Sequence, residues 1–191
     1  MKKLGSIALL GLLCLIGVNA FAQKNEFAAE ISGQFPSANN LSFEPAVGYQ
    51  LNYAHRLLGV PGVGLYVELP LVAGFNNQRT LTSLFNGQNY SSLYFTPGLK
   101  VKLLPSFFIS PYIAGGVGLA HFSASNGGGS ENDFAADIGG GFDVKVFPHV
   151  SLRAEARDFI TDTPGLSFNV LQNFAGKTNN VVASGGVVIR F

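Results

Sequence analysis

The chain has 191 residues, a formal net charge of +1 and only 12% charged residues, against about 25% in ordinary soluble proteins. Its 12 basic and 11 acidic residues nearly balance, which argues against a nucleic-acid partner. Beyond the leader described next, no segment approaches the run of about 18 apolar residues that a transmembrane helix needs. A chain so poor in charge that lacks a spanning helix is typical of a β-barrel in lipid.

The start of the chain has the pattern of a secretory signal peptide. Lys2 and Lys3 supply the positive charge, Ile7–Val18 the apolar run, and Ala20–Ala22 an A-x-A-like cleavage site. The apolar run is too short to cross a bilayer as a helix. We therefore expect residues 1–22 to be a signal peptide that is cleaved after export.

The predicted mature chain, residues 23–191, forms a single domain, because no linker, charge block or tandem repeat interrupts it. The one cysteine, Cys14, lies in the signal peptide and follows Leu13. A lipoprotein signal needs a small residue in that place, so lipidation is not expected. After cleavage no cysteine remains, which excludes disulfide and thiol chemistry.

Eight segments of the mature chain alternate apolar and polar residues with the period of two that strands show. Most reach the roughly 9–11 residues that a tilted transmembrane strand needs. The segments lie near 26–35, 43–57, 63–74, 92–103, 107–122, 133–146, 150–160 and 180–191.

Long and short connections alternate between these segments. The short ones, 58–62, 104–106 and 147–149, each contain a proline. Bacterial outer-membrane barrels have an even number of strands, with short periplasmic turns and longer outer loops. The predicted fold is therefore all-β: an eight-stranded antiparallel up-and-down transmembrane β-barrel with both termini in the periplasm.

The strands separate into an apolar and a charged face. The apolar face, with aromatic residues such as Phe35 and Phe134 near strand ends, is expected to contact lipid. The charged face is expected to form a network inside the lumen. Its members are Glu30, Arg56, Glu68, Lys100, Lys102, Asp137, Asp143, Lys145, Arg153, Glu155, Arg157 and Arg190.

A soluble lipocalin-like barrel has the same alternation but turns its apolar face inward. Soluble surfaces are about 25–35% charged, and twelve strand charges are too few to hydrate such an outer wall. Facing inward, five acids and seven bases nearly neutralise one another. The membrane barrel is therefore favoured. The segment 107–122 is apolar or glycine on both faces, so its register stays open.

The densest charge lies on the two segments joined by residues 147–149. If these residues form a three-residue turn, Asp143 lies opposite Arg153, and Asp137 lies diagonal to Arg157. Such pairs can gate solute passage, or they can simply satisfy charges in a lumen that eight strands leave just wide enough for side chains. The structural interpretation is favoured, because an unpaired buried ion costs several kcal/mol.

The final segment, Val181–Phe191, resembles the closing strand of bacterial outer-membrane barrels, with Phe191 as the terminal aromatic residue that the barrel-assembly machinery reads. Together with Ser110–Phe122, Gly139–Phe147 and Val150–Asp158, it makes the chain similar to the small outer-membrane barrel family that includes the OmpA membrane domain and opacity-type surface proteins. The resemblance implies a place in the bacterial outer membrane, among its lipid and lipopolysaccharide. We expect no peptidoglycan-binding domain after Phe191.

One cluster has the residue types of a hydrolase: His121, Ser123 and Glu131. Ser, His and an acid can perform acyl transfer, and the spacing resembles that of lipid A deacylase barrels. However, the motif is not continuous here, and His121 lies 70 residues before Phe191. We expect no catalytic site. The histidines His55, His121 and His149 lie on separate segments, so neither a metal nor a cofactor is expected.

The predicted protein is a monomeric barrel with a filled lumen that supports the outer membrane structurally, makes surface contacts, or does both. The outer loops 75–91 and 161–179 would carry any recognition. The first is rich in polar uncharged residues (Asn76, Asn77, Gln78, Asn86, Gln88 and Asn89) and indicates no particular partner. A narrow porin-like channel for small solutes is the alternative, and a lipid A-modifying acyl hydrolase a more remote one.

Overall fold

The computed structural model describes residues 24–38, 41–42, 46–76, 90–124, 129–162 and 177–191. The predicted signal peptide, 1–22, and most of the predicted loops 75–91 and 161–179 lie outside these ranges. Among the described residues, no helix has the length and apolar character that crossing a membrane requires.

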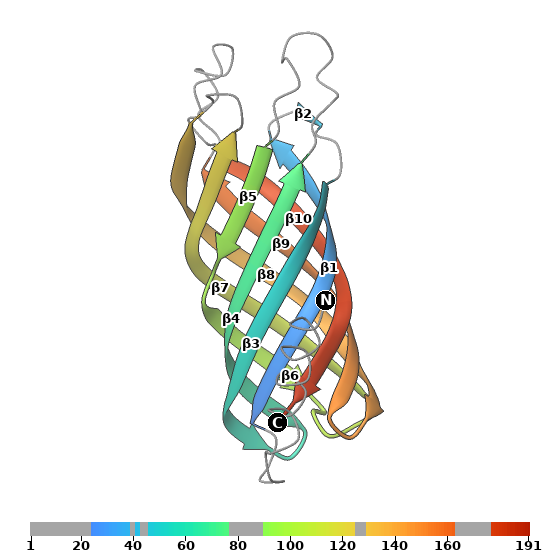
Figure 1. Ribbon diagram of the computed structural model, residues 1–191. Helices are drawn as coiled ribbons and strands as arrows, with labels where there is room; N and C mark the ends of the chain where they lie inside the picture. The colour runs from blue at the N-terminus through green and yellow to red at the C-terminus, as the bar shows by residue number, and fades with distance from the viewer. Residues whose placement is uncertain (1–23, 39–40, 43–45, 77–89, 125–128, 163–176) are drawn as a thin grey trace, which may run out of the picture.

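The described residues form a closed antiparallel barrel (Figure 1). Its strands are β1 (Asn25–Ala38), β2 (Leu41–Ser42), β3 (Ala46–Val60), β4 (Val63–Asn76), β5 (Tyr90–Phe95), β6 (Gly98–Leu103), β7 (Ile109–Ala124), β8 (Ser130–Phe147), β9 (Val150–Asp162) and β10 (Lys177–Arg190). Pairing of β10 with β1 closes the wall.

The wall has eight strands, as predicted, although ten elements are numbered. β5 and β6 are two parts of one wall strand, because both pair with β4 on one side and β7 on the other. The break falls at Thr96–Pro97, where proline cannot donate a hydrogen bond to the ladder. The short β2 pairs only with the end of β1. The predicted all-β up-and-down fold is thus confirmed.

The register sets the tilt of the strands. Each residue can be followed to its paired residue on the next strand, once around the barrel. Such a row that starts at Glu26 of β1 returns to β1 at Pro36, ten residues farther along the strand. A stagger of this size in an eight-stranded barrel corresponds to strands tilted by roughly 40° from the barrel axis. As a result, residues far apart in the pairing register meet at the same height inside the lumen.

The prolines mark the short turns correctly, but the predicted limits were wrong by a few residues. Pro61–Gly62 and Pro148–His149 are two-residue connections, while residues 104–108 join β6 to β7. Gly62 has a φ of 87°, which suits glycine after proline in a tight turn. Because the turn needs only Pro61 and Gly62, residues 58–60, which were predicted to lie in the connection, belong to β3. We call this end of the barrel, which also holds Asn25 and Phe191, the turn end, and the opposite end the loop end.

The two faces of the wall separate as the alternation predicts. Large apolar side chains cover the outside, among them Ile31, Ile113 and Ile138, each about two-thirds exposed. Exposed phenylalanines lie near the turn end (Phe107, Phe108 and Phe147) and towards the loop end (Phe35, Phe75 and Phe134). This outer surface has the apolar band and aromatic girdles of a transmembrane barrel.

Candidate functional site in the lumen

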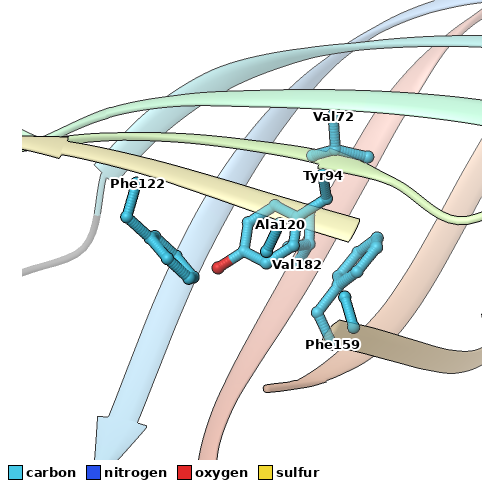
Figure 2. Close-up of a cluster of buried hydrophobic side chains, with 7 residues drawn as sticks. Val72, Tyr94, Ala120, Phe122, Phe159 and Val182 are labelled. Carbon is cyan, nitrogen blue, oxygen red and sulfur yellow. The ribbon is translucent and has the colours of Figure 1, made fainter. Parts of the chain in front are cut away.

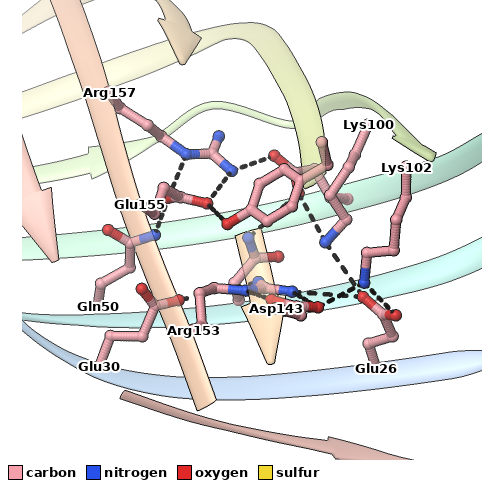
Figure 3. A network of polar contacts seen from close by, with 12 residues as sticks. Glu26, Glu30, Gln50, Lys100, Lys102, Asp143, Arg153, Glu155 and Arg157 are labelled. Atoms are coloured by element: carbon pink, nitrogen blue, oxygen red, sulfur yellow. Dashed lines mark hydrogen bonds and ion pairs between the residues drawn. The ribbon is translucent and has the colours of Figure 1, made fainter. Parts of the chain in front are cut away.

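The inside of the turn-end half is filled by buried ionic side chains (Figure 3). Ten of the twelve predicted network residues take part in ion pairs there: Glu30, Glu68, Lys100, Lys102, Asp137, Asp143, Arg153, Glu155, Arg157 and Arg190. Glu26, which the sequence interpretation missed, joins them. We call these eleven residues the charged layer. The other two predicted members, Arg56 and Lys145, are half-buried near the turn end and make none of the ion pairs described here.

One group of ion pairs centres on Asp143 of β8. Arg153 donates two hydrogen bonds to its carboxylate, from Nε (2.8 Å) and Nη2 (3.1 Å). Lys102 Nζ lies 2.6 Å from Asp143 Oδ2 and 2.5 Å from Glu26 Oε1. Arg190 Nη2 donates to Asp143 Oδ2 at 3.1 Å. Asp143 and Arg153 are direct cross-strand partners, so the register expected from the β8–β9 turn places them together.

A second group centres on Arg157 of β9. Its Nη1 donates to Asp137 Oδ2 at 2.8 Å, its Nε to Glu155 Oε1 at 2.5 Å, and its Nη2 to Glu68. Asp137 pairs with the residue two positions after Arg157, which is the diagonal relation that the turn length predicts. The guanidinium therefore uses all three nitrogens on three carboxylates from three different strands.

Lys100 links the two groups. Its Nζ lies 3.4 Å from Glu26 Oε2 and 3.3 Å from Glu68 Oε2. Two tyrosine rings flank it, with centroids 5.7 Å away for Tyr66 and 5.3 Å for Tyr112. Ring faces attract cations at such distances, so the aromatic side chains supplement the carboxylates around a fully buried ammonium group.

Neutral polar side chains complete the charged layer. The Tyr112 hydroxyl donates to Glu155 Oε2 at 2.5 Å, and Gln50 Nε2 donates to Glu155 Oε1 at 2.6 Å. The sequence interpretation missed both residues. Tyr112 lies on β7, whose apolar or glycine content on both faces left its register open. Gln50 is uncharged, so the pattern of charged residues does not mark it.

Small residues on the inner wall make room for these long side chains. A Cβ on Gly139 would lie 2.6 Å from Arg157 Cγ, and one on Gly141 would lie 2.9 Å from the Tyr112 hydroxyl. Such separations are too short for real carbon contacts, so any larger side chain there would displace the charged layer. The glycines thus serve packing inside the barrel.

The loop-end half of the lumen is filled differently. A cluster of buried apolar residues crosses it (Figure 2), and we call this cluster the apolar layer. The Tyr94 ring lies 4.7 Å from the Phe159 ring and 5.8 Å from the Phe122 ring. The members are Val72, Tyr94, Ala120, Phe122, Ala135, Phe159 and Val182.

The apolar layer was not predicted, although the sequence contains its signal. Phe159 stands two residues after Arg157 on β9, so it shares the inward face. Tyr94 shares the inward face with Lys100 and Lys102 of the same wall strand. Phe159 and Tyr94 therefore lie on the same inward face as the charged residues, at the height where apolar contacts replace ion pairs.

The hydrolase-like cluster is not assembled as a Ser–His–Glu triad. His121 is exposed on the outer wall, where its Nδ1 lies 2.7 Å from Asn132 Oδ1. Glu131 is the cross-strand partner of the buried Phe122, and alternation therefore directs it to the inner face. Ser123 lies two residues from His121 and shares its outer face.

The remaining predicted sites can be placed directly. Phe191 is half-buried, and its backbone exchanges two hydrogen bonds with Asn25, at 2.9 and 3.0 Å. The terminal residue thus continues the seam that closes the barrel.

The other two histidines also lie apart from each other. His55 lies 2.7 Å from the Asn25 side chain, while His149 lies 3.1 Å from the Arg190 carbonyl. No group of three or more His, Cys, Asp or Glu within the described ranges could hold a metal ion.

Together these features define the class of the protein: a closed eight-stranded barrel with an apolar outer wall and a lumen occupied by side chains. No protein-family model matches the chain, and no curated protein matches it in sequence. Solved structures do resemble it.

Three of these structures are small outer-membrane barrels. Neisserial surface protein A (NspA) has a TM-score of 0.62 and 15% identity, with 87% of this chain and 97% of that one covered. Ail, the attachment invasion locus protein of Yersinia pestis, has a TM-score of 0.55 and 11% identity, covering 88% and 100%. A major outer membrane protein from Thermus thermophilus has a TM-score of 0.53 and 17% identity, covering 87% and 99%. At these identities the likeness establishes the fold.

Proposed function

We propose that this protein is a monomeric bacterial outer-membrane barrel that does not conduct solutes, is not an enzyme, and acts as a structural or surface-contact element. The observation that carries the proposal is the occupied lumen. The charged layer fills one half and the apolar layer crosses the other, so a solute would meet two different barriers in series.

The two barriers support a closed lumen for separate physical reasons. To cross the charged layer, an ion has to compete with carboxylates already bound to Lys100, Lys102 and three arginines. To cross the apolar layer, it has to shed its water between Tyr94, Phe122 and Phe159, and apolar constrictions exclude ions by dewetting. The alternative of a narrow channel requires both layers to move.

The outer wall supports a place in lipid. Its exposed aliphatic side chains and the phenylalanines near both ends suit the hydrocarbon and interfacial regions of a bilayer. The expected orientation puts the turn end in the periplasm and the loop end outside, where the wall meets lipopolysaccharide. Contact of Phe191 with the barrel-assembly machinery belongs to the same proposal. So does recognition of a surface partner by the outer loops.

The absence of enzymatic activity is supported by the geometry around His121. Its imidazole bonds to Asn132, and Glu131 faces the other side of the wall. A serine hydrolase needs its base held by a correctly placed third group and close to the nucleophile. His121→Ala is therefore expected to leave the acylation of lipid A unchanged in cells that express the protein, as judged by mass spectrometry.

Single-channel recording in planar bilayers tests the main proposal. The mature protein is refolded in detergent, and its heat-dependent gel mobility first shows that a barrel has formed. We expect no discrete conductance steps under conditions in which a larger porin, refolded in the same way, gives them. Stable steps from the verified barrel would replace the proposal with the channel alternative.

A further inference from the structure

The charged layer contains more acids than bases. Glu26 adds a carboxylate that the sequence interpretation did not count, while Arg56 and Lys145 remain half-buried near the turn end. Six buried carboxylates (Glu26, Glu30, Glu68, Asp137, Asp143 and Glu155) therefore face five buried cations (Lys100, Lys102, Arg153, Arg157 and Arg190). One negative charge has no cation of its own, and an uncompensated buried charge costs several kcal/mol.

Glu30 is the acid with the weakest ionic contact. Its nearest described cation is Arg153, whose Nη1 lies 3.8 Å from Glu30 Oε1. Arg153 is already committed to Asp143 through Nε and Nη2. Glu30 Oε2 accepts a hydrogen bond from the Ser184 hydroxyl at 2.7 Å. Oε1, by contrast, is buried without a hydrogen-bond partner.

A second unpartnered acceptor lies beside it. Gln50 on β3 is the direct cross-strand partner of Glu30, and both side chains point into the lumen, next to each other (Figure 3). Gln50 Nε2 donates to Glu155, which fixes the orientation of the amide. Gln50 Oε1 is left buried and without a donor. The two side chains are therefore neighbours on adjacent strands, and each has one buried acceptor oxygen that lacks a donor.

We propose that Glu30 is a proton-binding site of the folded barrel: it carries a proton on Oε1 and donates it to Gln50 Oε1, while Oε2 accepts from Ser184. The proton satisfies both acceptors and leaves five carboxylates for five cations. The charged groups around Glu30 already balance one another. Arg153 and Arg157 are paired with Glu26 and Glu155, and the contacts from β3 and β10 are the uncharged Gln50 and Ser184. A neutral Glu30 therefore leaves this part of the lumen without net charge.

The proposal goes beyond a closed lumen and does not depend on it. It makes one proton a ligand of the folded state. An unfolded glutamate is ionised at neutral pH, because its carboxyl titrates near pH 4.3. Folding at neutral pH would therefore take up a proton, and the stability that Glu30 contributes would decline as the pH rises.

Infrared spectroscopy of the refolded barrel at neutral pH tests the site directly, because a protonated carboxylic acid has a C=O stretch distinct from that of a carboxylate. We expect this band in the wild type and its loss in Glu30→Gln, whose amide is a neutral mimic that donates to Gln50 and accepts from Ser184. Glu131→Gln is the matched control and should keep the band. No band in the wild type, or a band that persists in Glu30→Gln, would overturn the proposal.

The folding equilibrium provides an independent measurement. Between neutral and mildly alkaline pH, the folding constant of the wild type should fall relative to that of Glu30→Gln by about tenfold per pH unit. The series is repeated in sodium, potassium and choline chloride. Stabilisation of the wild type by sodium or potassium alone would assign the site to a metal ion and contradict the proton. Failure of Glu30→Gln to fold would also contradict it, since a neutral isostere should be accepted.

Discussion

The charged layer and the apolar layer occupy opposite halves of one lumen, and both are built from inward-facing positions of the wall strands, several of which contribute to both layers. β9 contributes Arg153 and Arg157 to the first and Phe159, two residues farther on, to the second. In the charged layer the ion pairs join particular atoms at particular distances, and an atom such as Glu30 Oε1 that lacks a hydrogen-bond partner is buried at a cost. In the apolar layer the Tyr94 hydroxyl accepts a hydrogen bond from Asn180 Nδ2 at 3.1 Å, and the other side chains need only fill the available volume.

The two layers differ in the substitutions that they can tolerate. A buried ionic group that loses its partner keeps its desolvation cost. Removal of one residue from the charged layer therefore leaves each of its ion-pair partners as an uncompensated buried charge. An apolar cluster loses only dispersion and burial in proportion to the atoms removed. The charged layer should therefore specify the barrel closely, whereas the apolar layer should accept substitutions of similar volume.

The largest effect is expected from Arg157→Ala, which leaves three buried carboxylates without their shared guanidinium. We expect a loss of about 3–5 kcal/mol in the free energy of unfolding, measured by urea titration of the refolded protein in micelles. Arg157→Lys restores the charge but not the three-way geometry and should lie between the two. Equal stability of Arg157→Ala and the wild type would show that the charged layer is hydrated enough to tolerate unpaired acids.

A smaller effect is expected from Tyr112→Phe, which deletes one hydroxyl and keeps the ring beside Lys100 and Lys102. The hydroxyl donates to the Glu155 carboxylate, and hydrogen bonds to charged groups contribute about 1.5–3 kcal/mol. The same urea titration measures the loss. Tyr66→Phe, which keeps the other ring, serves as the matched variant and should cost less. A greater loss of stability in Tyr66→Phe would show that the Tyr66 hydroxyl, and not the Tyr112 hydroxyl, makes the more stabilising hydrogen bond.

The apolar layer should respond less. Phe159→Leu keeps an apolar side chain of similar size, and such exchanges usually cost under about 1.5 kcal/mol. Because the layer would still exclude ions, planar-bilayer recordings of this variant should remain silent. Conductance in Phe159→Leu would mean that the aromatic contacts with Tyr94, and not apolar volume, keep the lumen closed.

The sequence predicted the wall better than it predicted the contents of the lumen. Alternation and the three prolines determine the strand number and the separation of faces, because a period of two and a tight turn are local properties. The turn joining β8 to β9 likewise placed Asp143 against Arg153. Contacts across the barrel, such as Glu26 with Lys102 or Gln50 with Glu155, depend on the stagger that carries a row from Glu26 to Pro36. That quantity exists only once the sheet has closed.

The smallest change in the free energy of unfolding is expected for a carboxylate on the outer wall. Asp158 lies on the apolar outside of β9, half-buried, where its Oδ2 accepts from the exposed Asn179 side chain at 3.1 Å. Unlike the acids of the charged layer, it has no buried cation that depends on it in the described structure. Asp158→Ala should therefore change the free energy of unfolding by less than about 0.5 kcal/mol, in micelles and in lipid vesicles alike. A loss approaching that of Arg157→Ala would mean that polar pairing on the lipid side stabilises the wall as strongly as the ion pairs inside it, and the contrast between inner and outer carboxylates would no longer hold.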